Sequence, residues 1–332
     1  MRVLVTGASG FVGGYLIEEL LRRGHMPVAM VRKGSDAARL KEVGVECRTG
    51  DLTDPESLVA VVKGADAVIH LAAYYSFTGK RELYEMINVE GTRHLMDAML
   101  ANGVKRLLYC SSTEVMGPTP DPPADESAPC HPIYEYGHSK LRAEEMVRDY
   151  AKKGIEPTIV RPSGIYGPRN LEDVSFWFIT TFANSIVSRF IIGSGKKKLQ
   201  FVHVEDVAQA FALALERPEV SNGQTYIVTD ERAYNYEEIY DILARIFKKD
   251  PPRRHLPVAL AKLIAAPVQA INAIRGKQNF IWRVQTMDTF KVDRWYSIEK
   301  VRRELGYSPR YKLEEGLRQT VRWYEQNGYI PS

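Results

Sequence analysis

The stretch MRVLVTGASGFVGGYLIEELL, residues 1–21, decides the fold of this chain. Its first six residues form an apolar run of the kind that a buried parallel strand requires. Gly7, Gly10 and Gly13 follow at a GxxGxxG spacing, and apolar residues then recur at helical spacing at Phe11, Leu16, Ile17, Leu20 and Leu21. Strand, glycine turn and helix in this order predict a dinucleotide site, with the pyrophosphate at the helix N-terminus. A glycine turn without a ligand is the alternative.

A second motif, YGHSK, lies far downstream at Tyr136–Lys140. Residues 137–153 continue as an amphipathic helix, and side chains four apart on a helix share a face. A free tyrosine, with a pKa of about 10, is a poor base at neutral pH. A nearby ammonium favours the phenolate, so Tyr136 and Lys140 are predicted to transfer a proton. An incidental pair on a surface helix is the alternative for this pentapeptide alone.

Between the two motifs, Arg106–Gly117 (RLLYCSSTEVMG) is an apolar strand that ends in hydroxyl groups. Ligands of open α/β sheets bind outside the carboxyl ends of the strands. The three features together indicate hydride transfer on a nicotinamide cofactor.

The chain alternates strand and helix through residue 160. Strands are expected near 2–6, 27–32, 45–48, 66–71, 105–110 and 155–160, and helices near 11–23, 55–63, 81–102 and 137–153. This pattern predicts an α/β fold, a doubly wound parallel Rossmann sheet with helices on both faces. We expect a dinucleotide-binding domain over 1–165 and a smaller, mainly helical substrate domain over 166–332. The chain is expected to cross back to the core near 199–229.

The chain resembles the extended short-chain dehydrogenase/reductases, which include sugar-nucleotide epimerases and dehydratases, hydroxysteroid dehydrogenases and dihydroflavonol reductases. The resemblance covers nearly the whole chain. Its motifs are TGASGFVGG at 6–14, GDLTD at 50–54, HLAA at 70–73, NVEGT at 88–92, SSTEVMG at 111–117, YGHSK at 136–140, RPSGIYGP at 161–168, FVHVEDVA at 201–208 and RRELGYSP at 302–309.

The resemblance implies a role for each matching position. Tyr136 would be the catalytic acid/base, Lys140 would lower its pKa and hold the nicotinamide ribose, and Ser112 would bind the reacting oxygen. Asn88 would be the helix asparagine near the active site. The other residues implied to contact the cofactor are Gly7, Ser9, Gly10, Phe11, Val12, Gly13, Asp51, Leu52, Ala72, Ala73, Pro162 and Ile165. The family usually forms a homodimer through helices that correspond to 81–102 and 137–153.

The end of the second strand, Val28–Lys33 (VAMVRK), predicts the cofactor. Folds that bind NAD place an acid here for the ribose 2′-hydroxyl. This chain has Arg32 and Lys33 instead, and an arginine fork suits a 2′-phosphate. NADP is therefore expected, with NAD possible. A surface basic pair is the alternative.

The substrate class is predicted from sugar-nucleotide motifs that this chain lacks. Sugar-nucleotide members usually carry asparagine before the IYGP motif, where Gly164 stands, and often Arg-Asp where this chain has Leu199 and Gln200. They also tend to carry Arg-x-Gly-Asp, which VDRWYS at 292–297 lacks. A diphosphate needs such cationic partners. We expect an apolar alcohol or ketone, near a helical pair over Leu256–Ile274 and the aromatic residues 176–178, which could equally be core.

The sequence therefore predicts an NAD(P)-dependent oxidoreductase similar to hydroxysteroid dehydrogenases and dihydroflavonol reductases. The first alternative is a nucleotide-sugar epimerase or dehydratase with tightly held NAD. Glu114 stands where dehydratases of the family use an acid, but Thr113 replaces the companion aspartate. The second alternative is a non-enzymatic NAD(P)-sensing protein. Such proteins usually lack the tyrosine–lysine couple.

Composition narrows the remaining possibilities. The net charge is +4 and is spread along the chain, so we expect no nucleic-acid partner. Three cysteines without metal-ligand spacing, Cys47, Cys110 and Cys130, predict a reducing cytoplasm and no metal site. No spanning segment is expected, whereas the apolar stretch 256–274 allows peripheral contact with a membrane.

Overall fold

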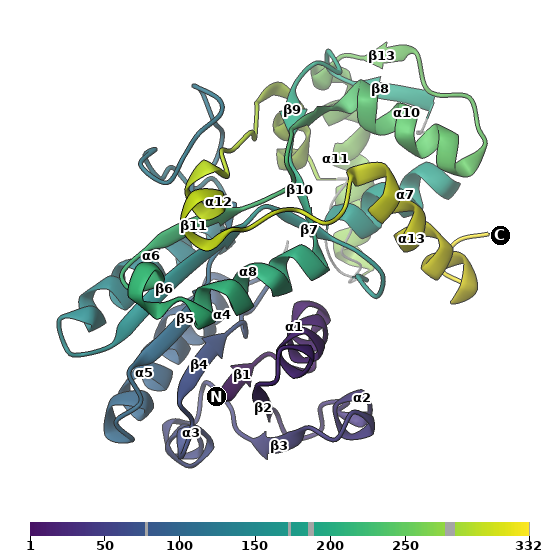
Figure 1. The fold of residues 1–332 in the computed structure, drawn as a ribbon. Helices are drawn as coiled ribbons and strands as arrows, with labels where there is room; N and C mark the ends of the chain where they lie inside the picture. Colours follow the sequence, from purple (N-terminus) through teal and green to yellow (C-terminus); the bar gives the residue numbers. More distant parts are fainter. Residues whose placement is uncertain (77–78, 172–173, 185–188, 276–282, 332) are drawn as a thin grey trace.

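The computed structural model describes residues 1–332 except 77–78, 172–173, 185–188, 276–282 and 332. Its centre is a parallel sheet of seven strands in the order β11-β6-β5-β4-β1-β2-β3 (Figure 1). The strands are β1 (Arg2–Thr6), β2 (Met26–Val31), β3 (Glu46–Thr49), β4 (Ala67–His70), β5 (Arg106–Cys110), β6 (Glu156–Pro162) and β11 (Thr225–Val228). The predicted doubly wound α/β fold is confirmed.

Helices cover both faces of this sheet. One face packs against α1 (Phe11–Arg22), α2 (Ala38–Glu42), α8 (Val204–Glu216) and α12 (Glu299–Leu305). The other packs against α3 (Pro55–Val62), α5 (Gly91–Ala101) and α6 (Glu135–Ala151). The apolar side chains that these helices pack against the sheet are almost completely buried. At roughly 25 cal/mol per Å² of apolar surface, this burial is the main stabilisation of the fold.

The helix predicted over 81–102 is divided into three parts. It begins as α4 (Arg81–Tyr84), continues as the π-helix η1 (Glu85–Glu90) and ends as α5. π-helical turns inside α-helices are rare and are frequent at functional sites. This turn carries Asn88, whose surroundings are described below.

After β6 the chain forms a second group of elements. They are β7 (Gly164–Tyr166), α7 (Val174–Asn184), β8 (Phe190–Ile192), β9 (Lys198–Leu199), β10 (Phe201–His203), β12 (Tyr234–Asn235), α10 (Tyr236–Phe247), β13 (Arg254–Leu256), α11 (Val258–Ile274), η4 (Gln285–Lys291) and α13 (Leu313–Gln326). Strand β11 and the helices α8, α9 (Pro218–Ser221) and α12 return to the main sheet. The domain division at 165/166 stays a prediction.

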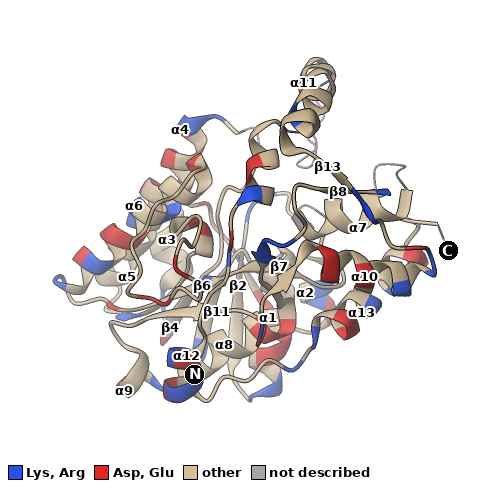
Figure 2. Ribbon diagram, turned by 90° about the horizontal axis from the view of Figure 1, so that it is seen from above, with Lys and Arg blue, Asp and Glu red and all other residues tan. Residues whose placement is uncertain are grey.

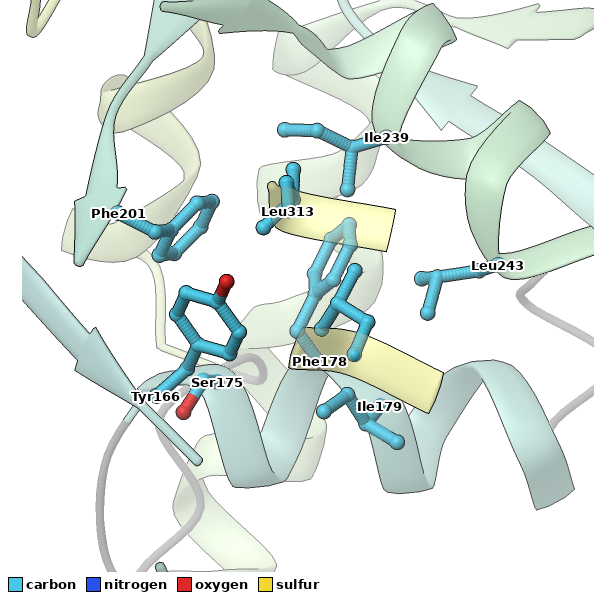
Figure 3. A pocket seen from close by; sticks show the side chains of 9 residues that line it. Tyr166, Ser175, Phe178, Ile179, Phe201, Ile239, Leu243 and Leu313 are labelled. Carbon is cyan, nitrogen blue, oxygen red and sulfur yellow. The ribbon is translucent and has the colours of Figure 1, made fainter. Parts of the chain in front are cut away.

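The apolar core of this second group is tightly filled. Tyr166, Phe178 and Phe201 line a small cavity in this core (Figure 3). Its volume is about 10 Å³, the space of about one water molecule. Substrate contact and core were both open for the aromatic residues 176–178. Phe176 and Phe178 pack against this core, and Phe176 lies edge-on to Tyr324 at 5.5 Å between ring centroids.

The prediction of a helical pair over a substrate pocket at 256–274 is wrong. Residues 258–274 form the single helix α11, because Pro267 lacks only one amide N–H and the other intrahelical hydrogen bonds remain available. None of its residues lines the cleft described below. Figure 2 shows α11 standing away from the body of the molecule. Leu263 and Ile274 are 72% and 87% exposed. Within the described residues, no helix combines the length and apolarity needed to cross a membrane.

The glycine turn after β1 is fixed by close backbone contacts. Gly7 has a φ of +70°, and a Cβ atom there would lie 2.8 Å from the Ala72 backbone nitrogen. A Cβ atom at Gly13 would lie 2.2 Å from the Gly7 carbonyl oxygen. Side chains of any size are therefore excluded at both positions, as the fingerprint requires.

We predict that Gly13→Ala lowers the melting temperature and weakens cofactor binding, because the methyl group displaces the backbone of residues 7–8. Overpacking of this kind costs about 1–3 kcal/mol. Gly14→Ala is the matched control, since its added Cβ meets only the tip of the Arg39 side chain, at 3.0 Å. Thermal unfolding and NADPH fluorescence titration measure both effects. Equal behaviour of the two variants would contradict the packing argument.

Candidate active site

A cleft of about 1100 Å³ opens at the carboxyl ends of the central strands. Residues directly after four strands line it: Gly7 after β1, Leu71 after β4, Ser111 after β5 and Ser163 after β6. The second group of elements supplies the opposite wall, including Phe201, Tyr236 and Arg294. Such a volume exceeds that of a typical small-molecule site and can hold a dinucleotide together with a substrate.

The glycine turn forms one end of this cleft. Gly10 is the N-cap of α1, and no side chain caps the helix or places an acid in its first turn. The first amide groups of α1 are therefore available to an anion, and the helix dipole favours negative charge there. The uncapped helix start and the absence of Cβ atoms fit a dinucleotide pyrophosphate. All six predicted residues of this turn line the cleft: Gly7, Ser9, Gly10, Phe11, Val12 and Gly13.

The cofactor contacts predicted after β2 and β3 are Arg32, Lys33, Asp51 and Leu52. Arg32, Asp51 and Leu52 line the cleft, whereas Lys33 does not. The Asp51 carboxylate accepts hydrogen bonds from the Thr53 backbone N–H at 2.9 Å and from the Thr53 hydroxyl at 2.8 Å. These bonds, with a smaller effect of Arg32, lower the pKa of Asp51. Arg32 is exposed at the end of β2 and can therefore reach a ligand.

Two of the three predicted catalytic residues, Ser112 and Tyr136, line the same cleft. Tyr136 lies in the first turn of α6, and its ring is 4.8 Å from the ring of Tyr75, edge-on. Ser112 precedes the 3-10 helix η2 (Thr113–Val115) and accepts a hydrogen bond from the Glu114 backbone N–H at 3.1 Å. Both side chains line the cleft, as do Ala72, Ala73, Pro162 and Ile165.

Lys140 lies beneath this surface. It is 2% exposed, and its Nζ is 4.3 Å from the centroid of the Tyr109 ring. Burial lowers the pKa of Lys140 to about 8. The side chain still carries a proton at neutral pH, because that pKa lies above 7. Its ammonium is therefore weakly hydrated and interacts more strongly with nearby charge than it would in water.

Asn88 does not line the cleft but connects its parts. Its Oδ1 accepts from the Tyr74 backbone N–H at 2.6 Å, and its Nδ2 donates to the Tyr74 carbonyl and to Ser139 Oγ at 3.0 and 2.9 Å. Ser139 belongs to the helix of Tyr136. The carbonyl of Asn88 accepts from the Thr92 hydroxyl at 2.7 Å. Asn88 thus holds the loop after β4 against α6.

His70 extends these bonds to the glycine turn. Because Thr92 Oγ1 donates to Asn88, its contact of 3.0 Å with His70 Nε2 is an N–H donation from histidine. Nδ1 then accepts from the Thr6 hydroxyl at 2.7 Å, and Thr6 Oγ1 accepts from the Ala72 N–H. Burial, and secondarily Lys140, lower the pKa of His70 to about 3, so this ring stays neutral.

The wall of the cleft also contains residues that the motifs did not predict. Arg294 is buried and pairs with Glu114, its Nη1 lying 2.7 Å from Glu114 Oε1. Tyr134, Tyr296 and Arg283 line the same part of the cleft. Glu114 and Arg294 are separated by 180 residues, so no local pattern could pair them. The only sequence signal was the acid at position 114.

The comparisons with known proteins place this geometry in a family. The profile of the "NAD dependent epimerase/dehydratase family" matches residues 3–229. A relative from Arabidopsis thaliana, "3beta-hydroxysteroid-dehydrogenase/decarboxylase isoform 1", is 30% identical over 346 residues, which cover 96% of this chain and 78% of the relative.

Two solved structures are similar over nearly their whole length. The crystal structure of gox2253 is 32% identical, with a TM-score of 0.83 and 99% of both chains covered. The structure of DesIV, a dTDP-glucose 4,6-dehydratase from Streptomyces venezuelae with NAD bound, is 25% identical, with a TM-score of 0.76, and covers 100% of this chain and 99% of that one. The chain belongs to the NAD-dependent epimerase/dehydratase family and is an enzyme of that family, which confirms the resemblance of its motifs.

We predict that Tyr136→Phe lowers turnover by two or more orders of magnitude, the usual size of a general acid–base contribution. Binding of the cofactor should be nearly unchanged, because only the hydroxyl is removed. Tyr150→Phe is the control, since Tyr150 lies on the same helix and its hydroxyl donates to Asp97 at 2.6 Å. Steady-state reduction of ketones with NADPH measures turnover. Near-normal activity of Tyr136→Phe would show that this residue is not the acid.

Proposed function

We propose that this member of the NAD-dependent epimerase/dehydratase family transfers hydride between NADP and a secondary alcohol or ketone without a nucleotide group. The observation that carries the proposal is that one cleft is lined both by the glycine turn at the uncapped start of α1 and by Ser112 and Tyr136. The relative named as a 3β-hydroxysteroid dehydrogenase/decarboxylase supports this class of reaction.

The roles of the side chains follow from their positions. When bound, the nicotinamide supplies or accepts the hydride at the substrate carbon. In reduction, Ser112 donates a hydrogen bond to the carbonyl oxygen, and Tyr136 transfers its hydroxyl proton to that oxygen as the alcohol forms. The buried Lys140 ammonium stabilises the resulting phenolate and can contact the nicotinamide ribose. In oxidation the same proton returns to Tyr136.

NADP is the proposed cofactor because Arg32 is exposed, lines the cleft and follows β2, where folds that bind NAD place an acid. A guanidinium can bind a 2′-phosphate through two hydrogen bonds. We propose that the other predicted residues contact the bound cofactor, with two exceptions. Lys33 is a surface neighbour of Arg32, and Asn88 positions the loop after β4 and the helix α6.

An apolar substrate is proposed from the lining of the catalytic end. Ile87, Ile133, Tyr236 and Phe201 face this part of the cleft. The guanidinium of Arg294 is already paired with a carboxylate, which weakens its attraction for a diphosphate. Arg283 also lines the cleft and has no carboxylate partner among the described residues. That cation is the observation in favour of the alternative, a nucleotide-sugar epimerase or dehydratase.

We also propose a cytoplasmic homodimer whose surface would allow peripheral contact with a membrane. The helices around α5 and α6 form the proposed dimer face, where Met86 is 43% exposed.

Helix α11 has no acidic residue and exposes an apolar face that includes Leu260, Leu263 and Ile271. A helix of this kind can lie in the interface of a bilayer.

We predict that Arg32→Ala weakens NADPH binding about tenfold or more and leaves NADH binding nearly unchanged. Hydrogen bonds to charged groups contribute about 1.5–3 kcal/mol, and only NADPH carries the 2′-phosphate. Lys33→Ala is the matched control, because Lys33 is the exposed neighbour that does not line the cleft. Fluorescence titration gives the four dissociation constants. Small, equal changes for both cofactors in Arg32→Ala would exclude a role in their discrimination.

A thermal-shift panel tests the substrate class. A ligand that binds the native state raises the apparent melting temperature by mass action. We expect apolar cyclic or phenolic ketones, added with NADPH, to give larger shifts than UDP, dTDP or UDP-glucose. A clear shift with UDP-glucose and none with the ketones would favour the epimerase and contradict the proposed reductase.

A further inference from the structure

A buried ion pair joins α6, the helix that carries Tyr136 and Lys140, to β6. Glu144 on α6 is 0% exposed, and Arg161 in β6 is 3% exposed. The guanidinium donates to both carboxylate oxygens, from Nε to Oε1 at 2.8 Å and from Nη2 to Oε2 at 2.7 Å. Arg148, one turn further along α6, also donates to Oε2 at 2.7 Å. The Glu144 carboxylate therefore has two cationic partners.

Glu144 lies one helical turn after Lys140, and both side chains are buried. Residues four apart on a helix can form an ion pair, and the low dielectric of the interior would strengthen it. Among the described residues, however, no ion pair or hydrogen bond engages Lys140 Nζ, which lies over the Tyr109 ring. The carboxylate that could bind this ammonium is bonded to Arg161 and Arg148 instead.

The other titratable groups that face Lys140 from the sheet are neutral at pH 7. Burial raises the pKa of the Tyr109 hydroxyl and raises that of the Cys110 thiol to about 11, whereas it lowers the pKa of His70 to about 3. Burial alone would also raise the pKa of Glu144, but the hydrogen bonds and charge of its arginine partner outweigh that effect and lower it. Glu144 is therefore ionised, and its charge acts on the Lys140 ammonium.

Charged groups on the other elements that pack against α6 have partners of their own. They are Arg81 of α4 with Glu135, Glu85 of η1 with Arg142, Asp97 of α5 with Tyr150, and Glu114 of η2 with Arg294. The ring of Tyr75 meets that of Tyr136 edge-on. Among the described residues, two acidic groups are thus left to compete for the Lys140 ammonium. They are the Tyr136 hydroxyl and the Glu144 carboxylate, four residues before and four residues after Lys140 on α6.

We propose that Arg161 is a positioning residue, which engages Glu144 and so leaves the Lys140 ammonium to Tyr136 and the bound cofactor. Without Arg161, the carboxylate would draw the ammonium one turn along α6, away from the reacting centre. This inference rests on the proposed function, in which Lys140 stabilises the phenolate of Tyr136. Neither Arg161 nor Glu144 lines the cleft, so their effect on the reaction passes through Lys140.

Ionisation of Tyr136 in the protein without ligands tests the proposal. It is followed by NMR of tyrosine labelled with ¹³C at Cζ, and Tyr136→Phe identifies the resonance. Arg161→Met lets Glu144 hold Lys140, so the pKa of Tyr136 should rise by about one unit or more, as the loss of a nearby opposite charge does. Glu144→Gln leaves the buried guanidinium without its anion and should lower the pKa of Tyr136.

The double variant Glu144→Gln/Arg161→Met separates charge from structure. It is neutral and avoids a buried unpaired charge. The pKa of Tyr136 should return to within about half a unit of the wild-type value, because the net charge beside Lys140 is restored. A pair that merely held α6 in place would not shift this pKa in opposite directions in the two single variants. Shifts of the same sign, or no shift, would overturn the proposal. If one single variant does not fold, the other is compared with the double variant, and the same criterion applies.

Two exposed residues of α6 give variants that leave the buried pair intact. Arg148→Met removes the second cation from Glu144, and its side chain is 45% exposed, so the fold should be retained. The pKa of Tyr136 should rise, by less than in Arg161→Met, because solvent screens an exposed charge. Glu145→Gln is the matched control, since it removes the same charge from the exposed neighbour of Glu144. No rise in Arg148→Met, or a shift in Glu145→Gln equal to that in Glu144→Gln, would overturn the proposal.

The pH dependence of alcohol oxidation distinguishes this inference from the proposed function. Oxidation requires the phenolate of Tyr136, so the acidic limb of the kcat profile should move with the NMR pKa in each variant. The expected NMR shifts in a protein that oxidises no alcohol with NADP would support the role of Arg161 and contradict the proposed hydride transfer. An active enzyme whose Tyr136 pKa does not respond to these variants would retain the proposed function and overturn the role of Arg161.

Discussion

The close approach of two backbone segments at the end of β1 is the constraint on which the rest of the site depends. A Cβ atom at Gly7 would meet the backbone of residues 71–72, and one at Gly13 would meet the carbonyl of Gly7. Glycine at both positions lets α1 begin directly above the sheet with its N-terminus uncapped. The position of any bound phosphate, and hence of the rest of the cofactor, follows from this contact.

A continuous series of hydrogen bonds connects that turn to α6, the helix that carries Tyr136. It runs from Ala72 through Thr6, His70 and Thr92 to Asn88, and then to Ser139 on α6. Burial keeps His70 neutral, so the direction of each bond is fixed by its partners. The π-helical turn at 85–90 places the Asn88 side chain between the loop after β4 and α6. The glycine turn and the helix that carries Tyr136 are therefore held together by one hydrogen-bond network.

The second group of elements determines what reaches this network. Its core is closely filled around a cavity of about 10 Å³, whereas the cleft between this group and the sheet has a volume of about 1100 Å³. Side chains from both sides meet there, and the Glu114–Arg294 pair crosses from one to the other. Helix α11 lies outside the cleft wall and exposes apolar residues instead of covering a substrate. The wall of the cleft thus combines residues that lie far apart in sequence.

The sequence by itself determined the six strands of the sheet through residue 162, the flanking helices α1, α3, α5 and α6, and the motifs that line the cleft. Each of these depends on local patterns: a glycine spacing, a period of apolar residues, or a tyrosine and lysine four apart on one helix. The tertiary structure decided which predicted residues reach the cleft surface. It buried Lys140, placed Asn88 behind the wall and left Lys33 outside it. In the folded chain α11 also continues past Pro267, and Arg294 pairs with Glu114, from which it is separated by 180 residues. Burial and pairing depend on neighbours brought together only by folding, so a local pattern cannot specify them.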